Sequence, residues 1–286
     1  MGVKLLNTFL KEKFGKCIIE KSWINYKNKK IAVYENNYIY KFLAEDNLIN
    51  GFKYMFNIFL KNNIHPLFIF DGKAPKEKIK EIEERKKTRK IITKKLENIK
   101  TFISRKKMIE YKRKIVKVTH IETDKVKELI DKYGFNYMDA PNESDILCCK
   151  LVQIGKVHAC LSEDMDMFIY GCSIVLRLYS NTNIIYEYNL KNILNAMNID
   201  LKNFKYLSIL ANNKQKNKNI FYFYNIYSNF TNNNIPGNFI DYIKNLYIIN
   251  DQQYDNLINI YNNYNLKKSN VLSKCNYILI KNRNIL

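Results

Sequence analysis

Residues 65–72 read His-Pro-Leu-Phe-Ile-Phe-Asp-Gly, a short apolar run that stops at Asp71 and Gly72. A run of this kind, bounded by turn residues, indicates a buried strand. Upstream, apolar residues recur at helical spacing through residues 45–63, and residues 29–43 begin with another apolar run. Strand, helix and strand in this order predict a parallel βαβ unit within an α/β sheet.

The pattern continues outward from this unit. We expect further elements in chain order: a helix at 124–133 ending before Gly134, a strand at 135–138, a helix at 143–154, and strands at 157–161 and 173–179. The sheet should end around Tyr188. Beyond residue 190 the chain is mostly helical and rich in Asn, with polar loops expected at 212–219 and 228–238. Residues 251–286 carry no pattern that predicts structure.

The sequence therefore predicts two regions. Residues 1–190 should form an α/β core with a mostly parallel, twisted sheet flanked by helices. Residues 191–286 should form a helical region.

Composition indicates the class of partner. The 286 residues are 47% hydrophobic, which excludes a disordered chain, and they carry a formal net charge of +21. Such an excess favours a polyanion, either nucleic acid or an anionic membrane surface. No stretch approaches the ~20 apolar residues of a spanning helix. The start of the chain soon meets Lys11, Glu12 and Lys13, so it is a poor signal peptide, and an intracellular location is expected.

More than half of the charge lies in residues 73–118, which hold 19 Lys or Arg residues against 6 Asp or Glu. This segment has no Gly, and Pro75 is its one helix breaker, so we predict a helix or a pair of helices. A solvated charged helix is one interpretation. The large excess of positive over negative side chains favours contact with phosphates instead.

The six cysteines do not resemble a metal or disulfide framework. Cys148 and Cys149 are adjacent, the others are scattered, and no CxxC pair occurs. The three histidines are isolated from any group of cysteines. We therefore expect buried or partly buried free thiols and no zinc site.

Acidic residues follow the predicted strands. Asp71 ends one strand, Glu143 and Asp145 stand at a helix start after Pro141, and Asp164 and Asp166 follow another strand. Ligands of open α/β sheets gather outside the carboxyl ends of the strands, so these side chains should converge. Asp164 and Asp166 would point to one side if the segment is extended.

Converging carboxylates suit hard cations such as Mg²⁺ or Mn²⁺, and two ions would assist phosphodiester hydrolysis. Each acid alone also has a structural interpretation, as a turn residue at Asp71 or as a loop or helix-capping residue at Asp164 and Asp166. Glu143 and Asp145 cannot share one face of a regular helix. They can converge if Glu143 lies in the non-helical entry to that helix.

Several motifs, in order and with their spacing intact over residues 1–179, resemble the flap endonuclease and xeroderma pigmentosum G family. They are Met1-Gly2-Val3, Ile31-Ala32-Val33 with Tyr40-Lys41-Phe42-Leu43, Phe70-Asp71-Gly72-Lys73-Ala74-Pro75, Ala140-Pro141-Asn142-Glu143-Ser144-Asp145, Gly155-Lys156-Val157, and Ser162-Glu163-Asp164-Met165-Asp166.

The resemblance implies a PIN-like nuclease fold with a basic helical arch, here residues 73–118, through which a single-stranded 5′ end passes. It implies metal ligands at Asp71, Glu143, Asp145, Asp164 and Asp166, with Mg²⁺ or Mn²⁺ as cofactor and two ions expected. By position, Lys78 and Arg85 resemble the arch cations that contact the scissile phosphate. Tyr40 resembles the base-stacking aromatic, and Lys73, Lys76 and Arg89 are further candidates for nucleic-acid contact.

The sequence also departs from the family. The first-strand metal-binding Asp of the family falls at Tyr34, and strand alternation should point the adjacent Glu35 away from the site. A bulge there would bring Glu35 inward. The last family Asp aligns with Asn213. The downstream helix-hairpin-helix is reduced to residues 235–243, and no sliding-clamp motif is evident.

These features predict a divergent, metal-dependent nuclease of the 5′-flap type in DNA replication, repair or recombination. It would be a monomer that binds branched or single-stranded DNA, without a membrane partner. It would act in the nucleus if cellular, or in a replication compartment in the cytoplasm if viral. One alternative is a pseudonuclease that binds branched or single-stranded nucleic acid without cleavage. Another is an RNA-directed nuclease.

Overall fold

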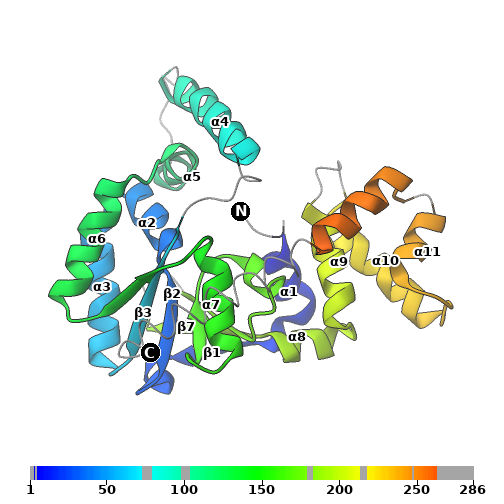
Figure 1. Cartoon of the computed structure of the whole chain (residues 1–286), viewed down its shortest axis with the longest axis horizontal. Helices are drawn as coiled ribbons and strands as arrows, with labels where there is room; N and C mark the ends of the chain where they lie inside the picture. The colour runs from blue at the N-terminus through cyan, green and yellow to red at the C-terminus, as the bar shows by residue number, and fades with distance from the viewer. Residues whose placement is uncertain are drawn as a thin grey trace.

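A seven-stranded sheet forms the centre of the protein, shown in Figure 1 as a computed structural model. The structure describes residues 3, 5–72, 79–97, 104–178, 183–212, 218–246 and 248–262. Side by side the strands run β1-β7-β6-β5-β2-β3-β4. Their bounds are β1 Ile18–Ser22, β2 Lys30–Tyr34, β3 His65–Phe70, β4 Asn136–Asp139, β5 Ala159–Leu161, β6 Ile174–Leu178 and β7 Ile184–Asn189.

The sheet is mostly parallel, as predicted. The central strand β2 pairs in parallel with β3 and with β5, and β4 and β6 extend the parallel part on either side. Strand β7 runs antiparallel to both β6 and β1. All parallel strands therefore end at one edge, which we call the carboxyl edge. Strand β1 was not predicted, because a half-exposed edge strand has no continuous apolar run.

One face of the sheet is covered by α2 (Glu35–Ala44), α3 (Leu48–Lys61) and α6 (His120–Lys132) (Figure 1). Its core is aromatic. Phe56 of α3 packs edge-on against Phe68 of β3, with ring centroids 5.3 Å apart, and Phe59 is also fully buried. The predicted βαβ unit is confirmed, with two helices between its strands.

The opposite face packs against α1 (Leu6–Phe14), α7 (Ser144–Gln153) and α8 (Leu190–Met197), followed by α9 (Leu201–Asn212), α10 (Ile220–Asn232) and α11 (Phe239–Asn245). The prediction of a loop at 228–238 is wrong for residues 228–232, since α10 continues to Asn232. Tyr227 and Phe230 hold that turn by packing edge-on against Phe239 of α11. A further helix at 251–262 was also not predicted.

The basic segment forms two helices in its described parts, α4 (Ile79–Glu97) and α5 (Arg105–Ile115). Both lie beyond the carboxyl edge (Figure 1). Helix α5 is joined to the end of α2 by two ion pairs: Lys112 contacts Asp46, and Arg113 contacts Glu45 at 3.1 Å. The prediction of a helix pair is confirmed for these residues.

Helix α6 begins at His120, four residues earlier than predicted. The reason is a capping box in which the Thr119 amide donates to the Glu122 carboxylate at 2.8 Å. Gly134 follows the helix with φ +69°, the left-handed geometry that favours glycine. Of the helices described, none is long and apolar enough to cross a membrane.

Candidate functional site

Asp71 lies just past β3, where hydrogen bonds from two helix starts hold its carboxylate. Its Oδ1 accepts from the Ser144 backbone amide at 2.9 Å and from the Ser144 hydroxyl at 2.5 Å, and its Oδ2 accepts from Asn36 Nδ2 at 2.7 Å. Ser144 begins α7 and Asn36 lies in the first turn of α2. The carboxylate is therefore oriented by α2 and α7 together.

Glu143 and Asp145 stand at the start of α7, and both are buried. Glu143 is the N-cap, with extended backbone angles of φ −86° and ψ 127°, while Asp145 lies in the first helical turn. Glu143 therefore lies in the non-helical entry to α7, which is the condition under which the two acids can converge. The two acids flank Ser144 in the chain, and Ser144 donates to Asp71.

Asp164 and Asp166 follow β5 in a segment that is not extended, and the interpretation of Asp164 as a helix-capping residue is confirmed. Asp164 is the N-cap of a short 3₁₀ helix, Met165–Phe168, and its Oδ1 accepts from the Asp166 amide at 3.0 Å. This capping hydrogen bond starts the 3₁₀ helix directly after Asp164, so the chain leaves the direction of β5 there. The loop is fixed from outside by Arg177 of β6, which donates twice to Glu163 at 2.7 and 3.2 Å.

Tyr34 ends β2 and lies among the acids. Burial, and then the charges of Asp71, Asp145, Glu35 and Asp164, raise the pKa of its phenol well above the ordinary value. The tyrosine is therefore not turned away from the site.

Strand β2 ends at Tyr34 and Glu35 is the first residue of α2, so the strand alternation used in the prediction does not set the direction of its side chain. The Glu35 side chain is only 3% exposed. Burial, followed by the charge of Asp71, raises the pKa of its carboxyl well above the ordinary value.

The donor set has the chemistry of a site for a hard divalent cation. It offers carboxylate oxygens, and Glu35 Oε2 is buried without a hydrogen-bond partner in the described part of the chain. In that same part, no three His, Cys, Asp or Glu side chains are already arranged to hold an ion. The residues fit Mg²⁺ or Mn²⁺ by the chemistry of their oxygen atoms.

Basic side chains on α4 form a concave surface beyond the acidic edge. Its volume is about 540 Å³, and it is lined by Lys86, Lys87, Arg89, Lys90, Thr93, Lys94 and Glu97. Arg85 is exposed on the same helix, while Tyr40 is partly buried on α2. Lys73, Lys76, Lys78 and Asn213 lie outside the described residues.

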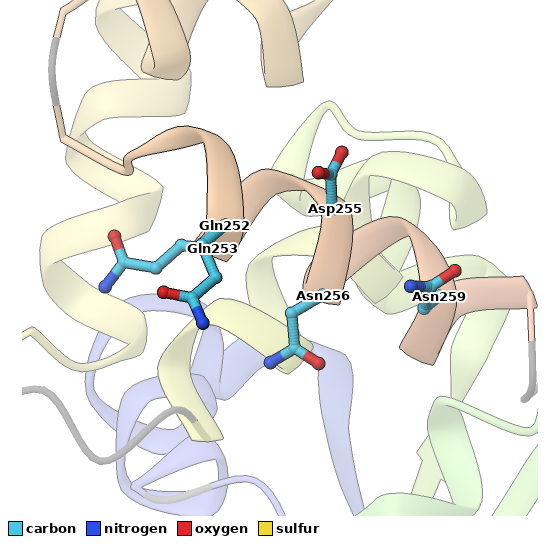
Figure 2. A pocket seen from close by; sticks show the side chains of 5 residues that line it. All are labelled: Gln252, Gln253, Asp255, Asn256 and Asn259. Carbon is cyan, nitrogen blue, oxygen red and sulfur yellow. The ribbon is translucent and has the colours of Figure 1, made fainter.

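A second cavity of about 550 Å³ lies along the helix at 251–262. Figure 2 shows its lining, which consists of Gln252, Gln253, Asp255, Asn256 and Asn259. Asp255 points to the opposite side of the helix from Asn256 in this view. The lining is carboxamide-rich and contains none of the predicted site residues.

The adjacent Cys148 and Cys149 of α7, Cys160 of β5 and Cys172 belong to one buried core cluster. The Cys149 thiol donates to the Met167 carbonyl at 3.5 Å, and the Cys172 thiol donates to the Ile174 carbonyl at 3.5 Å. All four are buried free thiols, which confirms that part of the prediction. Their proximity could not be predicted, because it depends on how α7 packs on the sheet.

Three positioning residues were also not identified from the sequence. Asn36 and Ser144 orient Asp71, and Arg177 orients the loop of Asp164. Ser144 stands inside an acidic motif, which is a signal that could have been used. Asn36 and Arg177 carry no such signal, since their partners are more than ten residues away.

Comparison with known families gives matches to two regions of one family. The XPG N-terminal domain matches residues 1–92, and the XPG I-region matches residues 134–213. Together they cover more than half of the chain and include all five acidic site residues.

Individual relatives agree. Flap endonuclease 1 of Encephalitozoon cuniculi is 29% identical over 228 residues, which is 73% of this chain and 66% of that protein. Flap endonuclease 1 of Debaryomyces hansenii is 32% identical over 230 residues, covering 73% and 61%. The human protein of the same name is 29% identical over 229 residues, covering 73% and 60%. The chain thus spans somewhat less than two thirds of the length of these relatives.

Solved structures show the same fold. The catalytic core of Rad2 in complex with a DNA substrate superposes with a TM-score of 0.66 at 22% identity, covering 92% of this chain and 84% of that one. Flap endonuclease-1 from Methanococcus jannaschii gives 0.58 at 23% identity, covering 87% and 83%. The expected PIN-like nuclease fold is confirmed.

Proposed function

Because the chain belongs to the flap endonuclease/XPG family, we propose that it is a divergent structure-specific nuclease that cleaves branched DNA of the 5′-flap type. The observation that carries this proposal is the placement of five acidic residues at the carboxyl edge, with basic helices beyond it. Neither feature alone specifies cleavage. An acidic site supplies the chemistry, and a basic surface next to it supplies a place for the phosphate backbone.

The proposed metal ligands are Asp71, Glu143, Asp145, Asp164 and Asp166. Bound Mg²⁺ or Mn²⁺ would activate water and neutralise charge on the phosphodiester. The role of the chain is to position these carboxylates so that they can coordinate an ion. Asn36 and Ser144 do so for Asp71, and the Arg177–Glu163 pair does so for the loop of Asp164.

The basic helices are proposed to receive the single strand. Arg85 and Lys78 would stabilise negative charge that develops on the phosphate, and Lys73, Lys76 and Arg89 would bind its neighbours. Tyr40 on α2 would stack against a base beside the cleaved bond.

Cleavage of labelled 5′-flap DNA by the purified protein in Mg²⁺ and in Mn²⁺ tests the proposal. Asp71→Asn and Asp164→Asn should each lower the rate by at least about a hundredfold, because the phosphate loses a positioned cation. Glu20→Gln removes an exposed acid on the edge strand β1 and is the matched control. Absence of cleavage by the wild-type protein with either ion, across several branched substrates, would rule the proposal out.

A second candidate function is binding of branched nucleic acid without cleavage. Tyr34 favours it, since a phenol stands where the family has an acidic metal ligand and the charges of Asp71 and Asp145 act on it. In that case Asp71→Asn would leave DNA affinity unchanged and wild-type cleavage would be absent. Gain of cleavage in Tyr34→Asp would then identify the tyrosine as the block.

An RNA-directed nuclease is the remaining alternative. Matched DNA and RNA flaps distinguish it, because a preference for RNA requires recognition of the 2′-hydroxyl. We propose DNA as the substrate, and faster cleavage of the RNA flap under the same conditions would reverse that choice.

A further inference from the structure

Two consecutive asparagines in the first turn of α2, Asn36 and Asn37, contact two different acid-bearing loops. Asn36 Nδ2 donates to Asp71 Oδ2 at 2.7 Å, just past the end of β3. Asn37 Nδ2 donates to the hydroxyl oxygen of Ser162 at 2.8 Å, directly after β5. These two hydrogen bonds join the start of α2 to both loops.

The order of the strands places the start of α2 between these loops. Strand β2 lies between β3 and β5 and runs parallel to both, and α2 begins directly after β2. Successive side chains of an α-helix diverge by about 100° around its axis. Asn36 can therefore reach the loop after β3 while Asn37 reaches the loop after β5.

The Ser162 hydroxyl connects Asn37 to Asp164. Its oxygen also accepts from the Asp164 backbone amide at 3.0 Å, so both of its acceptor positions are filled. The serine is fully buried, and its own amide donates to the Leu176 carbonyl of β6 at 3.0 Å. Ser162 is thus fixed by the sheet, and its hydroxyl orients the backbone at Asp164.

The loop after β5 is bound from both of the neighbouring strands. On the side of β6, Arg177 donates to Glu163 at 2.7 Å. On the side of β2, the described contact comes from Asn37. Because Asn36 stands next to Asn37 and orients Asp71, the contact of Asn37 also determines where Asp164 lies relative to Asp71.

We infer that Asn37 is a positioning residue for Asp164, which acts through the Ser162 hydroxyl and keeps the loop after β5 in register with the loop of Asp71. This role rests on the proposed nuclease function. A reaction that uses acids from both loops depends on their relative placement, and small displacements of reacting groups lower its rate.

Hydrogen exchange of the metal-free full chain, followed by mass spectrometry, tests the contact without reference to cleavage. Asn37→Ala should speed exchange of the amides of residues 163–168 by roughly two- to tenfold, the factor for loss of one hydrogen bond. Asn62→Ala is the matched control. Asn62 Nδ2 also donates at 2.8 Å, to the Ile58 carbonyl at the end of α3, away from the acids. It should leave exchange of residues 163–168 unchanged.

Cleavage kinetics on 5′-flap DNA test the positioning role. Asn37→Ala and Ser162→Ala should each lower kcat by roughly 10–100-fold, as for other residues that orient a ligand, and leave KM within about twofold. The double variant should lose no more than the larger single loss, because both residues act through one contact. Asn62→Ala should match the wild type.

Four outcomes decide the inference. Faster exchange of residues 163–168 in Asn37→Ala, with lower kcat at unchanged KM, supports it. Unchanged exchange overturns it, and so does unchanged kcat despite faster exchange, while both leave the proposed function intact. Absence of cleavage by the wild-type protein rejects the proposed function and, with it, the role of Asn37 in cleavage. Faster exchange in Asn37→Ala would then still support the contact that fixes the loop.

Discussion

At the scale of single residues, Asp71 is the best-positioned acid of the site. Three donors from two helices fix both of its oxygens, so its orientation does not depend on a bound ion. Hydrogen bonds to a carboxylate are stronger than those between neutral groups. The site is therefore partly preorganised by uncharged neighbours, which the acidic motifs alone do not reveal.

Ser144→Ala tests this arrangement. The variant removes a fully buried hydroxyl that donates to Asp71, and should lower the free energy of unfolding by about 1.5–3 kcal/mol, the range for a hydrogen bond to a charged group. Urea unfolding measures the change. Ser173→Ala, at an exposed serine, is the control and should lie within about 0.5 kcal/mol of the wild type. Equal stability of both variants would contradict the role given to the Ser144 hydroxyl.

The cysteines give a second prediction at this scale. Cys148, Cys149, Cys160 and Cys172 are buried, whereas Cys17 is partly exposed. Burial raises the pKa of the thiols of Cys148, Cys149 and Cys160, which removes the reactive thiolate. Brief treatment of the native protein with iodoacetamide should label Cys17 and leave these three unmodified in peptide mass spectra. Their labelling should appear only in denaturant, and early modification of Cys160 would show that the core opens.

At the scale of elements, the site depends on a close approach between the end of β3 and the loop that leads into α7. The Gly72 amide donates to the Asn142 carbonyl at 2.7 Å. A Cβ on Gly72 would lie 2.1 Å from the Ala140 carbonyl oxygen, which is backbone and cannot rotate away. Only glycine lets the loop bearing Glu143 pass so near Asp71.

Gly72→Ala should therefore separate the two loops. We expect a loss of about 1–3 kcal/mol in the free energy of unfolding, as for other overpacked sites, together with weaker Mn²⁺ binding. Gly15→Ala is the matched control, since nothing lies within 4 Å of its Cβ and its φ of −54° suits alanine. Thermal unfolding with and without Mn²⁺ measures both effects. A Gly72→Ala protein as stable as Gly15→Ala would contradict the close approach.

The sequence predicted most elements of the core but not where each begins. Buried strands such as β3 stand out as continuous apolar runs, whereas the edge strand β1 does not. The start of α6 is set by the Thr119–Glu122 capping box, four residues before the apolar periodicity becomes visible. Local hydrogen bonds of this kind define boundaries that hydrophobic patterns miss.

At the scale of the whole molecule, the excess positive charge is concentrated beyond the acidic edge. Helices α4 and α5 lie there, and α5 is attached to α2 through Asp46 and Glu45 (Figure 1). The two charged regions have opposite signs, and the helices lie beyond the edge of the sheet that bears the acids (Figure 1). A polyanion bound by the helices would therefore be presented to the carboxylates.

The salt dependence of DNA binding tests whether the positive charge on α4 contacts the phosphates. Replacing Lys87, Lys90 and Lys94 of α4 with alanine should reduce the slope of log K against log salt by about two to three, one unit for each lost phosphate contact. The control replaces Lys27, Lys29 and Lys61, which are exposed where β2 and β3 begin, at the opposite edge. Fluorescence anisotropy with a 5′-flap substrate measures both slopes. Equal slopes for the two triple variants would show that binding follows net charge alone.

The sequence by itself determined the fold class, the family and the five acids, because apolar runs and motif spacing are properties of local sequence. It also placed the basic helices and showed that Tyr34 stands where the family has an acid. Each of these features can be recognised without knowing which residues meet in space.

Only the tertiary structure decided how residues 34 and 35 are used. Whether Tyr34 faces the acids, and whether Glu35 stays at the carboxyl edge, depends on where β2 ends and α2 begins. The support of Asp71 by Asn36 and Ser144 likewise joins residues 35 and 73 positions apart. Such contacts follow from packing of the sheet against its helices, which no local pattern encodes.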